Sequence, residues 1–336
     1  MGDKSRIEWT DATWNPVTGC TKVSPGCENC YIARTPPFRM AGRKFAKTCG
    51  EDGCSGHAYL GDGIGATTGV QLHPDRLDQP LRWAKPRRVF VNSLSDLFHA
   101  DVPDEYIARV FAVMALTPRH TFQVLTKRHG RMRALLSSGL FRRSMYDALV
   151  RLNHTTVDAT PIAWPLPNVW MGVSVEDQKR ADLRIPALLD TPAAVRFLSC
   201  EPLLGSVDLR LVEYVGEDCR GCSGLLSPAH EPGNHLAPGE WSGIDWVIAG
   251  GESGKDARPM HPNWARSLRD QCNEAGVPLL FKQWGEWVTE DQSPQDATLP
   301  ATAQRLLGED QPPVWRIGKH AAGRELDGRT WDEYPC

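Results

Sequence analysis

Three cysteines lie close together near the N-terminus. They are Cys20, Cys27 and Cys30, spaced C-x6-C-x2-C. Soft thiolate ligands suit iron and sulfide, so three of them can hold three irons of a [4Fe-4S] cluster and leave the fourth iron open. An open iron can bind a small molecule. The alternative is a zinc site with a fourth ligand from elsewhere, since C-x2-C pairs are typical of zinc. The pattern favours the cluster.

Composition limits the class of protein. The 336 residues suffice for one large α/β domain or two small ones. A formal net charge of −3 gives no global signal for nucleic-acid binding. We find neither an apolar run near the ~20 residues of a membrane span nor a signal peptide, so we expect no membrane partner. Ten cysteines without a signal peptide favour a reducing compartment, so we expect a cytoplasmic protein in a bacterial or phage-infected cell.

Short apolar runs alternate with amphipathic segments along most of the chain. The predicted strands cover residues 12–14, 88–93, 121–126, 169–175, 195–200, 246–250 and 278–281. The predicted helices cover residues 104–116, 130–137, 177–189 and 263–275. Such alternation implies βαβ units and a parallel sheet. We therefore predict an α/β fold, a partial TIM-like (β/α) barrel over residues 1–288. It carries irregular insertions at about 38–69 and 208–243, and residues 289–336 form a C-terminal extension.

Polar or charged residues, with two glycines, follow nearly every predicted strand. In chain order they are Asn92, Ser93, Ser95, Asp96, Lys127, Ser174, Glu176, Glu201, Gly250, Gly251, Glu252 and Lys282. Each alone is more often a helix cap or a solvated loop residue. In barrels, however, the chemistry lies at the C-terminal ends of the strands. Together with the cysteine loop, these positions predict one functional edge.

Five segments carry a family resemblance. They are residues 14–20, 91–99, 123–128, 250–260 and 281–285. The chain resembles, from about Ile7 to Trp287, a phage- and prophage-associated family of poorly assigned function. That family is known for a three-cysteine motif and is regarded as similar to radical S-adenosylmethionine (SAM) enzymes. The resemblance implies a partial (β/α)6-type barrel, a [4Fe-4S] cluster on Cys20, Cys27 and Cys30, and SAM; it implies no substrate.

Two departures from the radical SAM pattern stand out. The commonest spacing is C-x3-C-x2-C, and here the first gap is three residues longer. The Gly-Gly-Glu segment usual at the second strand is replaced by residues 92–96, whereas Gly250 to Glu252 follow a later strand. The usual role of that segment is therefore not transferred to Gly250, Gly251 and Glu252.

Charge matching suggests roles for the strand-end residues around SAM. Asp96, Ser93 and Ser95, next to Asn92, are expected to accept from the ammonium group. Ser174 would donate to the carboxylate or ribose, and Glu176 or Glu201 would take the ribose hydroxyls. Gly250 and Gly251 would let adenine or its ribose approach the backbone. The predicted catalytic and substrate-holding residues are Lys127, Glu201, Glu252 and Lys282, with Arg128 beside them. Cys200 is either a hydrogen-atom donor or a buried core cysteine.

A second group of cysteines predicts a possible structural zinc site. It combines Cys49 and Cys54 of the first insertion with Cys219 and Cys222 of the second. His57, His230 and His235 lie nearby in the sequence. Four thiolates would make a closed zinc site. Free thiols in surface loops are the alternative.

Three functional hypotheses remain. The first is a radical SAM enzyme acting on a nucleotide or a modified DNA base, which suits the basic positions Lys85, Arg87, Arg88, Lys127 and Arg128. The second is a radical SAM enzyme acting on a peptide or small metabolite. Both need an electron donor such as flavodoxin or ferredoxin. The third is a non-enzymatic zinc-binding barrel that docks nucleic acid or protein.

Overall fold

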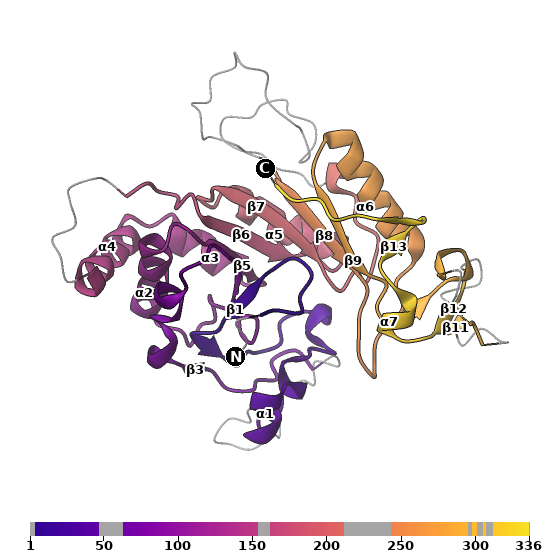
Figure 1. Cartoon of the computed structure of the whole chain (residues 1–336), viewed down its shortest axis with the longest axis horizontal. Coiled ribbons are helices and arrows are strands. Elements are labelled where there is room, and N and C mark those ends of the chain that lie inside the picture. The colour runs from indigo at the N-terminus through magenta and orange to yellow at the C-terminus, as the bar shows by residue number, and fades with distance from the viewer. Residues whose placement is uncertain are drawn as a thin grey trace, which may run out of the picture. The chain divides into compact units, whose positions relative to one another are not determined.

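The computed structural model describes most of the chain in two compact units. The described residues are 4–46, 63–153, 162–211, 243–294, 298–300, 305–306 and 312–335. The first unit is Met1–Val169 and the second is Trp170–Cys336. Figure 1 labels their elements.

The first unit contains three parallel strands in chain order. They are β1 (Ala12–Trp14), β4 (Arg88–Val91) and β5 (Thr121–Thr126). Trp14 lies opposite Val91, and Val91 lies opposite Val124. The C-terminal ends of all three strands therefore meet at one edge. The apolar residues of β4 are buried, as expected for a strand covered on both faces.

Three helices accompany these strands: α2 (Asp104–Leu116), α3 (His129–Leu136) and α4 (Gly139–Asn153). Both α2 and α3 were predicted. No helix was predicted over the segment that forms α4, and the structure corrects this. Phe141, Met145 and Leu149 recur at helical spacing and are buried, and the ring of Phe141 meets Phe111 of α2 edge-on at 5.5 Å. α2 and α4 pack side by side (Figure 1).

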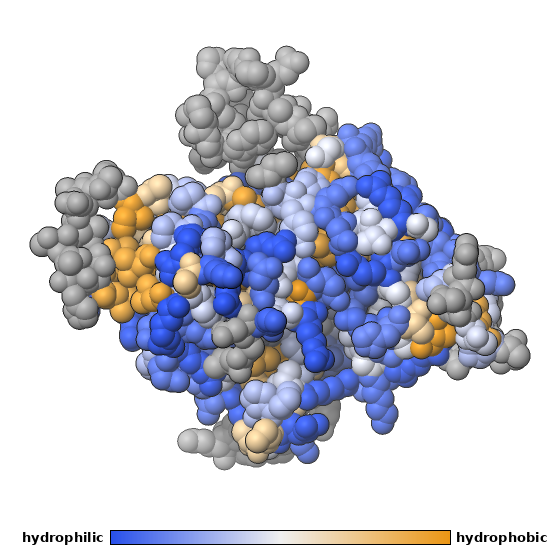
Figure 2. Space-filling view, viewed as in Figure 1, coloured by the Kyte–Doolittle hydropathy of each residue, from blue (hydrophilic) through white to orange (hydrophobic). Residues whose placement is uncertain are grey.

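The outer face of α4 is partly apolar. Leu140 has 79% of its surface exposed, and Val150 has 37%. Figure 2 shows hydrophobic surface gathered over this helix. Nothing in the described residues shows what covers it.

Short elements surround the cysteine loop. β2 (Val17–Thr18) pairs antiparallel with β3 (Gln71–Leu72). The loop itself contains two 3₁₀ turns, Pro25–Cys27 and Ile32–Arg34, followed by α1 (Pro36–Met40). Two further 3₁₀ turns, Pro74–Arg76 and Gln79–Arg82, lead towards β4.

The second unit contains four parallel strands, again in chain order. They are β6 (Val169–Ser174), β7 (Val195–Cys200), β8 (Trp246–Gly250) and β9 (Leu279–Gln283). Helix α5 (Gln178–Leu189) follows β6, and α6 (Pro262–Ala275) follows β8. Asp177 caps α5 by accepting from the backbone N–H of Arg180 at 3.0 Å. α6 ends at Gly276, whose φ of 66° is the left-handed conformation that glycine readily adopts at the end of a helix.

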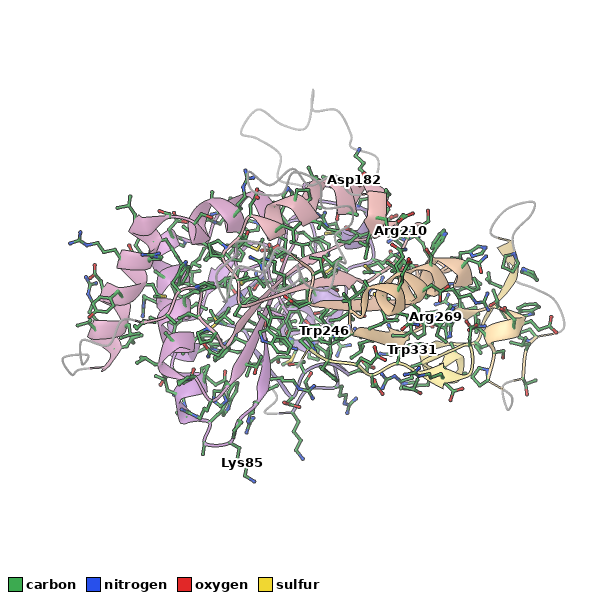
Figure 3. The ribbon with its side chains drawn as sticks, turned by 90° about the horizontal axis from the view of Figure 1, so that it is seen from above. Lys85, Asp182, Arg210, Trp246, Arg269 and Trp331 are labelled. Atoms are coloured by element: carbon green, nitrogen blue, oxygen red, sulfur yellow. The ribbon has the colours of Figure 1, made fainter. Side chains whose placement is uncertain are left out.

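β10 (Trp287–Val288) lies just before the predicted C-terminal extension. The extension itself contains several short elements: a 3₁₀ turn at Glu290–Gln292, β11 (Arg305–Leu306), β12 (Pro313–Arg316), α7 (Lys319–Ala322), β13 (Glu325–Leu326) and β14 (Arg329–Thr330). The final residues run along β9. Phe281 donates to the carbonyl of Trp331, and the backbone N–H of Glu333 donates to Leu279. The guanidinium of Arg269, on α6, lies 5.9 Å from the Trp331 ring (Figure 3).

These elements confirm the mixed α/β class. The seven predicted strands are present, and all are parallel. Consecutive parallel strands joined through helices are consistent with a TIM-like arrangement. The division into a domain of residues 1–288 and an extension stays a prediction. None of the helices in the described residues is long and apolar enough to cross a bilayer.

Candidate functional site

The cysteine loop is anchored to the C-terminal edge of the first unit's strands. The backbone N–H of Gly19 donates to Leu94 at 2.9 Å, just beyond β4. Gly19 has a φ of 95°, and a Cβ there would overlap the carbonyl oxygen of Gly69. Only glycine therefore fits this turn. Cys20 N–H donates to the Thr68 hydroxyl at 3.0 Å, which fixes the start of the loop.

The three predicted ligand thiols lie near one another. Cys20, Cys27 and Cys30 are free and partly buried. Burial, together with negative charge on Asp96, Cys27 and Cys30, raises the pKa of Cys20 to about 12. Burial also raises the pKa of Cys30, whereas a hydrogen bond from the Ile32 backbone lowers it. Only thiols within electrostatic range of one another affect each other in this way.

Three cations surround these thiols. Arg128 lowers the pKa of Cys20, and Lys127 and Lys22 lower that of Cys30. The Lys22 ammonium donates to the carbonyl of Glu28 at 2.6 Å, and Arg128 donates to Thr21 at 3.3 Å. Positive charge fixed by backbone carbonyls stabilises negative charge on sulfur. The loop is therefore suited to hold an anionic group.

Asp96 joins the ends of β4 and β5. Its Oδ1 accepts from the Thr126 hydroxyl at 2.7 Å and from Phe98 N–H at 3.0 Å. Its Oδ2 accepts from Lys127 N–H at 3.0 Å. Both oxygens are used, and the residue is 6% exposed. Asp96 therefore positions this edge, and its predicted contact with the SAM ammonium stays a prediction.

The other predicted residues after β4 also bond within the unit. The Ser93 hydroxyl exchanges hydrogen bonds with the Asn15 amide, and its carbonyl accepts from the Tyr31 hydroxyl. Ser95 donates to the carbonyl of Val17 at 2.9 Å. Asn15 also accepts from Leu94 N–H at 2.8 Å. Asn15 is not among the site residues predicted from sequence, although it lies in the first resemblance segment, residues 14–20.

Asn92 differs from its neighbours. It is 3% exposed and has a φ of 61°, an unusual conformation for a residue other than glycine. Its Oδ1 accepts from Val17 N–H at 3.3 Å. Its Nδ2 has no partner among the described residues. A buried donor without a partner is costly, so Asn92 marks this edge as a place where a ligand acceptor would be stabilised.

The predicted basic positions separate into two groups. Lys127 and Arg128 lie beside the cysteine loop. Lys85, Arg87 and Arg88 precede or begin β4 and so lie at the opposite ends of the strands. Arg88 pairs with Asp11 at 3.3 Å, Arg87 lies 4.9 Å from the Trp83 ring, and Lys85 projects outwards (Figure 3). These three residues do not line the cysteine loop.

In the second unit, two of the predicted carboxylates are held tightly by arginines. Glu176 and Arg184 form an ion pair of 2.7 Å, with side-chain exposures of 0% and 4%. Arg184 also donates to the carbonyl of Ser174 at 2.7 Å. Glu252 accepts from the guanidinium of Arg258 at 2.7 and 2.9 Å and from its backbone N–H at 2.8 Å. Both arginines position the strand ends, and neither was singled out from sequence.

The third carboxylate forms a pair that is more accessible than Glu176–Arg184. Glu201 and Lys282 approach to 2.9 Å, with side-chain exposures of 13% and 19%. They follow or end β7 and β9, and they meet beside Gly250 at the end of β8. A Cβ on Gly250 would lie 3.1 Å from Glu201 Oε1, while one on Gly251 would overlap the Trp284 carbonyl. Protein atoms therefore occupy the space beside both glycines. The predicted approach of adenine to their backbone stays a prediction.

The remaining predicted residues divide as follows. Cys200 is fully buried, which matches the alternative of a core cysteine. The predicted zinc ligands lie outside the described residues: Cys49, Cys54, Cys219 and Cys222, with His57, His230 and His235. Within the described ranges, no three Cys, His, Asp or Glu side chains are already arranged as a metal site. The three loop thiols fit a metal group by their donor chemistry and their surrounding charge.

Comparisons with known proteins identify the family. No curated protein and no solved structure matches the chain. A family described as "Protein of unknown function (DUF5131)" matches residues 4–335, which include the cysteine loop and the strand-end residues of both units. The chain therefore belongs to this uncharacterised family.

Proposed function

We propose that the protein is a radical SAM enzyme whose Cys20, Cys27 and Cys30 hold a [4Fe-4S] cluster. One observation carries the proposal: three free thiols share one anchored loop, affect one another electrostatically and are surrounded by three cations. The resemblance of the cysteine and strand-end segments to a radical-SAM-like family supports the same conclusion. The structural zinc site on the second cysteine group stays part of the proposal.

A cluster held by Cys20, Cys27 and Cys30 would supply the electron for reductive cleavage of SAM, and the resulting 5′-deoxyadenosyl radical would abstract hydrogen from the substrate. The protein's own groups prepare that chemistry. The Ile32 N–H stabilises thiolate on Cys30, and Arg128 stabilises it on Cys20. The unpartnered Nδ2 of Asn92 would donate to an acceptor on SAM, such as its carboxylate. An electron donor such as flavodoxin or ferredoxin completes the system.

The charge beside the loop suggests a substrate class. Lys127 and Arg128 place two cations beside the loop, which suits a phosphate-bearing nucleotide or a modified DNA base in a phage setting. A peptide or small metabolite is the alternative, and the paired carboxylates of the second unit are compatible with it. Comparing SAM cleavage with and without added nucleotides or DNA distinguishes these substrates.

The decisive experiment is anaerobic reconstitution of the full chain with iron and sulfide. We expect about four irons per chain, absorption near 400 nm and an electron paramagnetic resonance signal after reduction. With dithionite and SAM, 5′-deoxyadenosine should form. Cys27→Ala should lose the iron, the signal and the product.

Cys272→Ala is the matched control, because Cys272 is a free, buried cysteine on α6. It should keep full iron content and SAM cleavage. SAM cleavage that survives in Cys27→Ala contradicts the proposal. So does zinc bound at the loop without uptake of iron, which would favour a zinc-binding barrel that docks nucleic acid or protein.

A further inference from the structure

The Glu201–Lys282 pair depends on two features of the second unit's strands. Where Gly250 pairs with Gln283, the register of β8 and β9 shifts, so one additional residue, Lys282, is accommodated on β9. Such bulges redirect a side chain and are common beside active sites. Gly250 leaves the space in which Glu201 Oε1 and Lys282 lie. A bulge and a glycine thus bring a carboxylate and an ammonium group together at the strand ends.

The pair leaves hydrogen-bonding capacity for a ligand. A lysine ammonium has three donors, and a carboxylate has two accepting oxygens. The ion pair joins one donor of Lys282 to Oε1 of Glu201. Both side chains keep part of their surface exposed, unlike the Glu176–Arg184 pair.

Gln283 adds a second and independent observation. Its side-chain amide donates to the carbonyl of Gly251 at 3.2 Å, so it lies beside the glycine that follows Gly250. Its Oε1 is buried and has no partner among the described residues, and the residue is only 6% exposed. A buried acceptor without a donor costs free energy unless a ligand or water satisfies it. This acceptor therefore points to a ligand that donates.

The three groups together define a pattern of one donor and two acceptors. Lys282 donates, while Glu201 and Gln283 accept. A complementary ligand edge presents one acceptor and two donors. A 2-amino-6-oxopurine ring has such an edge, with its O6 as acceptor and its N1–H and 2-amino group as donors. The Watson–Crick edge of adenine does not match this set, because it presents one donor and one acceptor.

We propose that the second unit binds the Watson–Crick edge of a guanine-type ring through Lys282, Glu201 and Gln283. Lys282 donates to O6, Glu201 Oε2 accepts from N1–H, and Gln283 Oε1 accepts from the 2-amino group. Flipped or free bases are commonly read by hydrogen bonds to this edge. The inference needs only the second unit. It rests neither on the cluster nor on SAM.

The test is calorimetric titration of the full chain, prepared without iron, with GMP, IMP and AMP. We expect GMP to bind at least about tenfold more tightly than AMP, whose edge mismatches the charged pair. IMP lacks only the 2-amino group and should bind about fivefold more weakly than GMP, as expected for the loss of one neutral hydrogen bond. Equal affinity for GMP and AMP, or no binding of GMP, overturns the proposal.

Gln283→Met isolates the 2-amino contact. The variant should bind GMP and IMP equally, because it lacks the acceptor that distinguishes them. This ratio does not depend on how much of the protein is folded. A ratio that stays at about five shows that Gln283 does not read the 2-amino group, and it contradicts the proposal.

A charge swap separates ligand binding from a structural role of the pair. The double variant Glu201→Lys with Lys282→Glu keeps an ion pair, so we expect a nearly unchanged melting temperature and loss of GMP binding. If the swapped protein still binds GMP as the parent does, the pair serves stability alone and the proposal fails. Lys179→Met, which removes an exposed lysine of α5, is the control and should bind GMP normally.

Because no iron is present, this result is independent of the proposed function. GMP binding by the iron-free protein, with no SAM cleavage after anaerobic reconstitution, would support the inference and count against the radical mechanism. SAM cleavage by a protein that shows no preference for GMP would support the radical mechanism and contradict the guanine site.

Discussion

The polar side chains at the strand ends have different kinds of partner in the two units. In the first unit, Asp96, Ser95 and Asn15 bond to backbone groups, and the nearby cations lie beside the cysteine thiols. In the second unit, each predicted carboxylate has a cation of its own. The first arrangement leaves positive charge to stabilise an anionic group. The second is electrically balanced and therefore suits a neutral polar ligand.

The largest expected effect breaks the buried pair of the second unit. Arg184→Met removes the cation that pairs with the buried Glu176 carboxylate, which should lower the free energy of unfolding by about 3–5 kcal/mol. Urea denaturation measures the loss. Glu176→Gln combined with Arg184→Met should recover part of it, because no charge then stays buried.

Arg210→Met provides the matched comparison. Arg210 pairs with Asp208 at 2.9 Å, but its side chain is 61% exposed. We expect no measurable change in stability for this variant. A loss for Arg184→Met that is no greater than that of Arg210→Met would remove the distinction between buried and exposed pairs.

A smaller effect is expected at the strand ends of the first unit. Asp96→Asn puts an amide donor against either Lys127 N–H or the Thr126 hydroxyl, so one hydrogen bond is lost. The free energy of unfolding should fall by about 1–3 kcal/mol in protein without iron. Asp75→Asn, at a side chain that is 77% exposed, is the control and should be neutral. Unchanged stability with lost SAM binding would instead make Asp96 a ligand contact.

The smallest effect concerns Asp327, where the carboxylate–cation pairing of the second unit continues at the surface. Hydrogen bonds from Arg266 and Arg269 lower the pKa of Asp327 from 3.8 to about 2. Ionised Asp327 therefore stabilises the folded protein above about pH 4, and this contribution is lost as the pH falls towards 2. Its side chain is 35% exposed, so at neutral pH we expect less than about 1 kcal/mol.

Asp327→Asn should flatten the decrease in stability over that acid range and leave the rest of the pH profile unchanged. Chemical denaturation at a series of pH values measures this. A parallel decrease in the variant would assign the acid sensitivity to other carboxylates.

The elements that sequence predicted best are those encoded locally. The limits of α2, β7 and β8 follow from apolar runs and helical spacing, and the structure confirms them. α4 was missed although Phe141, Met145 and Leu149 carry the helical period, because several arginines and a flanking glycine resemble a polar connection. The helical spacing of the apolar residues favoured a helix, whereas the polar composition did not. Packing of the segment on α2 stabilises the helix.

In the candidate site, too, local features could be predicted from sequence and long-range contacts could not. The three cysteines share one short loop, so their proximity is a property of the local sequence. The partner of Glu201 depends instead on the register between β8 and β9 and on a bulge at Lys282. Residues 81 positions apart in the chain cannot be paired without that register. Sequence therefore predicted which residues occupy the strand ends, but not that the carboxylates of the second unit are already neutralised.

The final residues of the chain have a consequence for biosynthesis. Trp331 and Glu333 occupy the edge of β9, and the indole of Trp246 donates to the Glu333 carbonyl at 2.8 Å. During translation, β9 leaves the ribosome well before these residues. Its outer edge then stays an unpaired template that can recruit other strands. The second unit can thus complete its fold only once the last segment has been synthesised, which makes nascent chains stalled before Trp331 prone to aggregation.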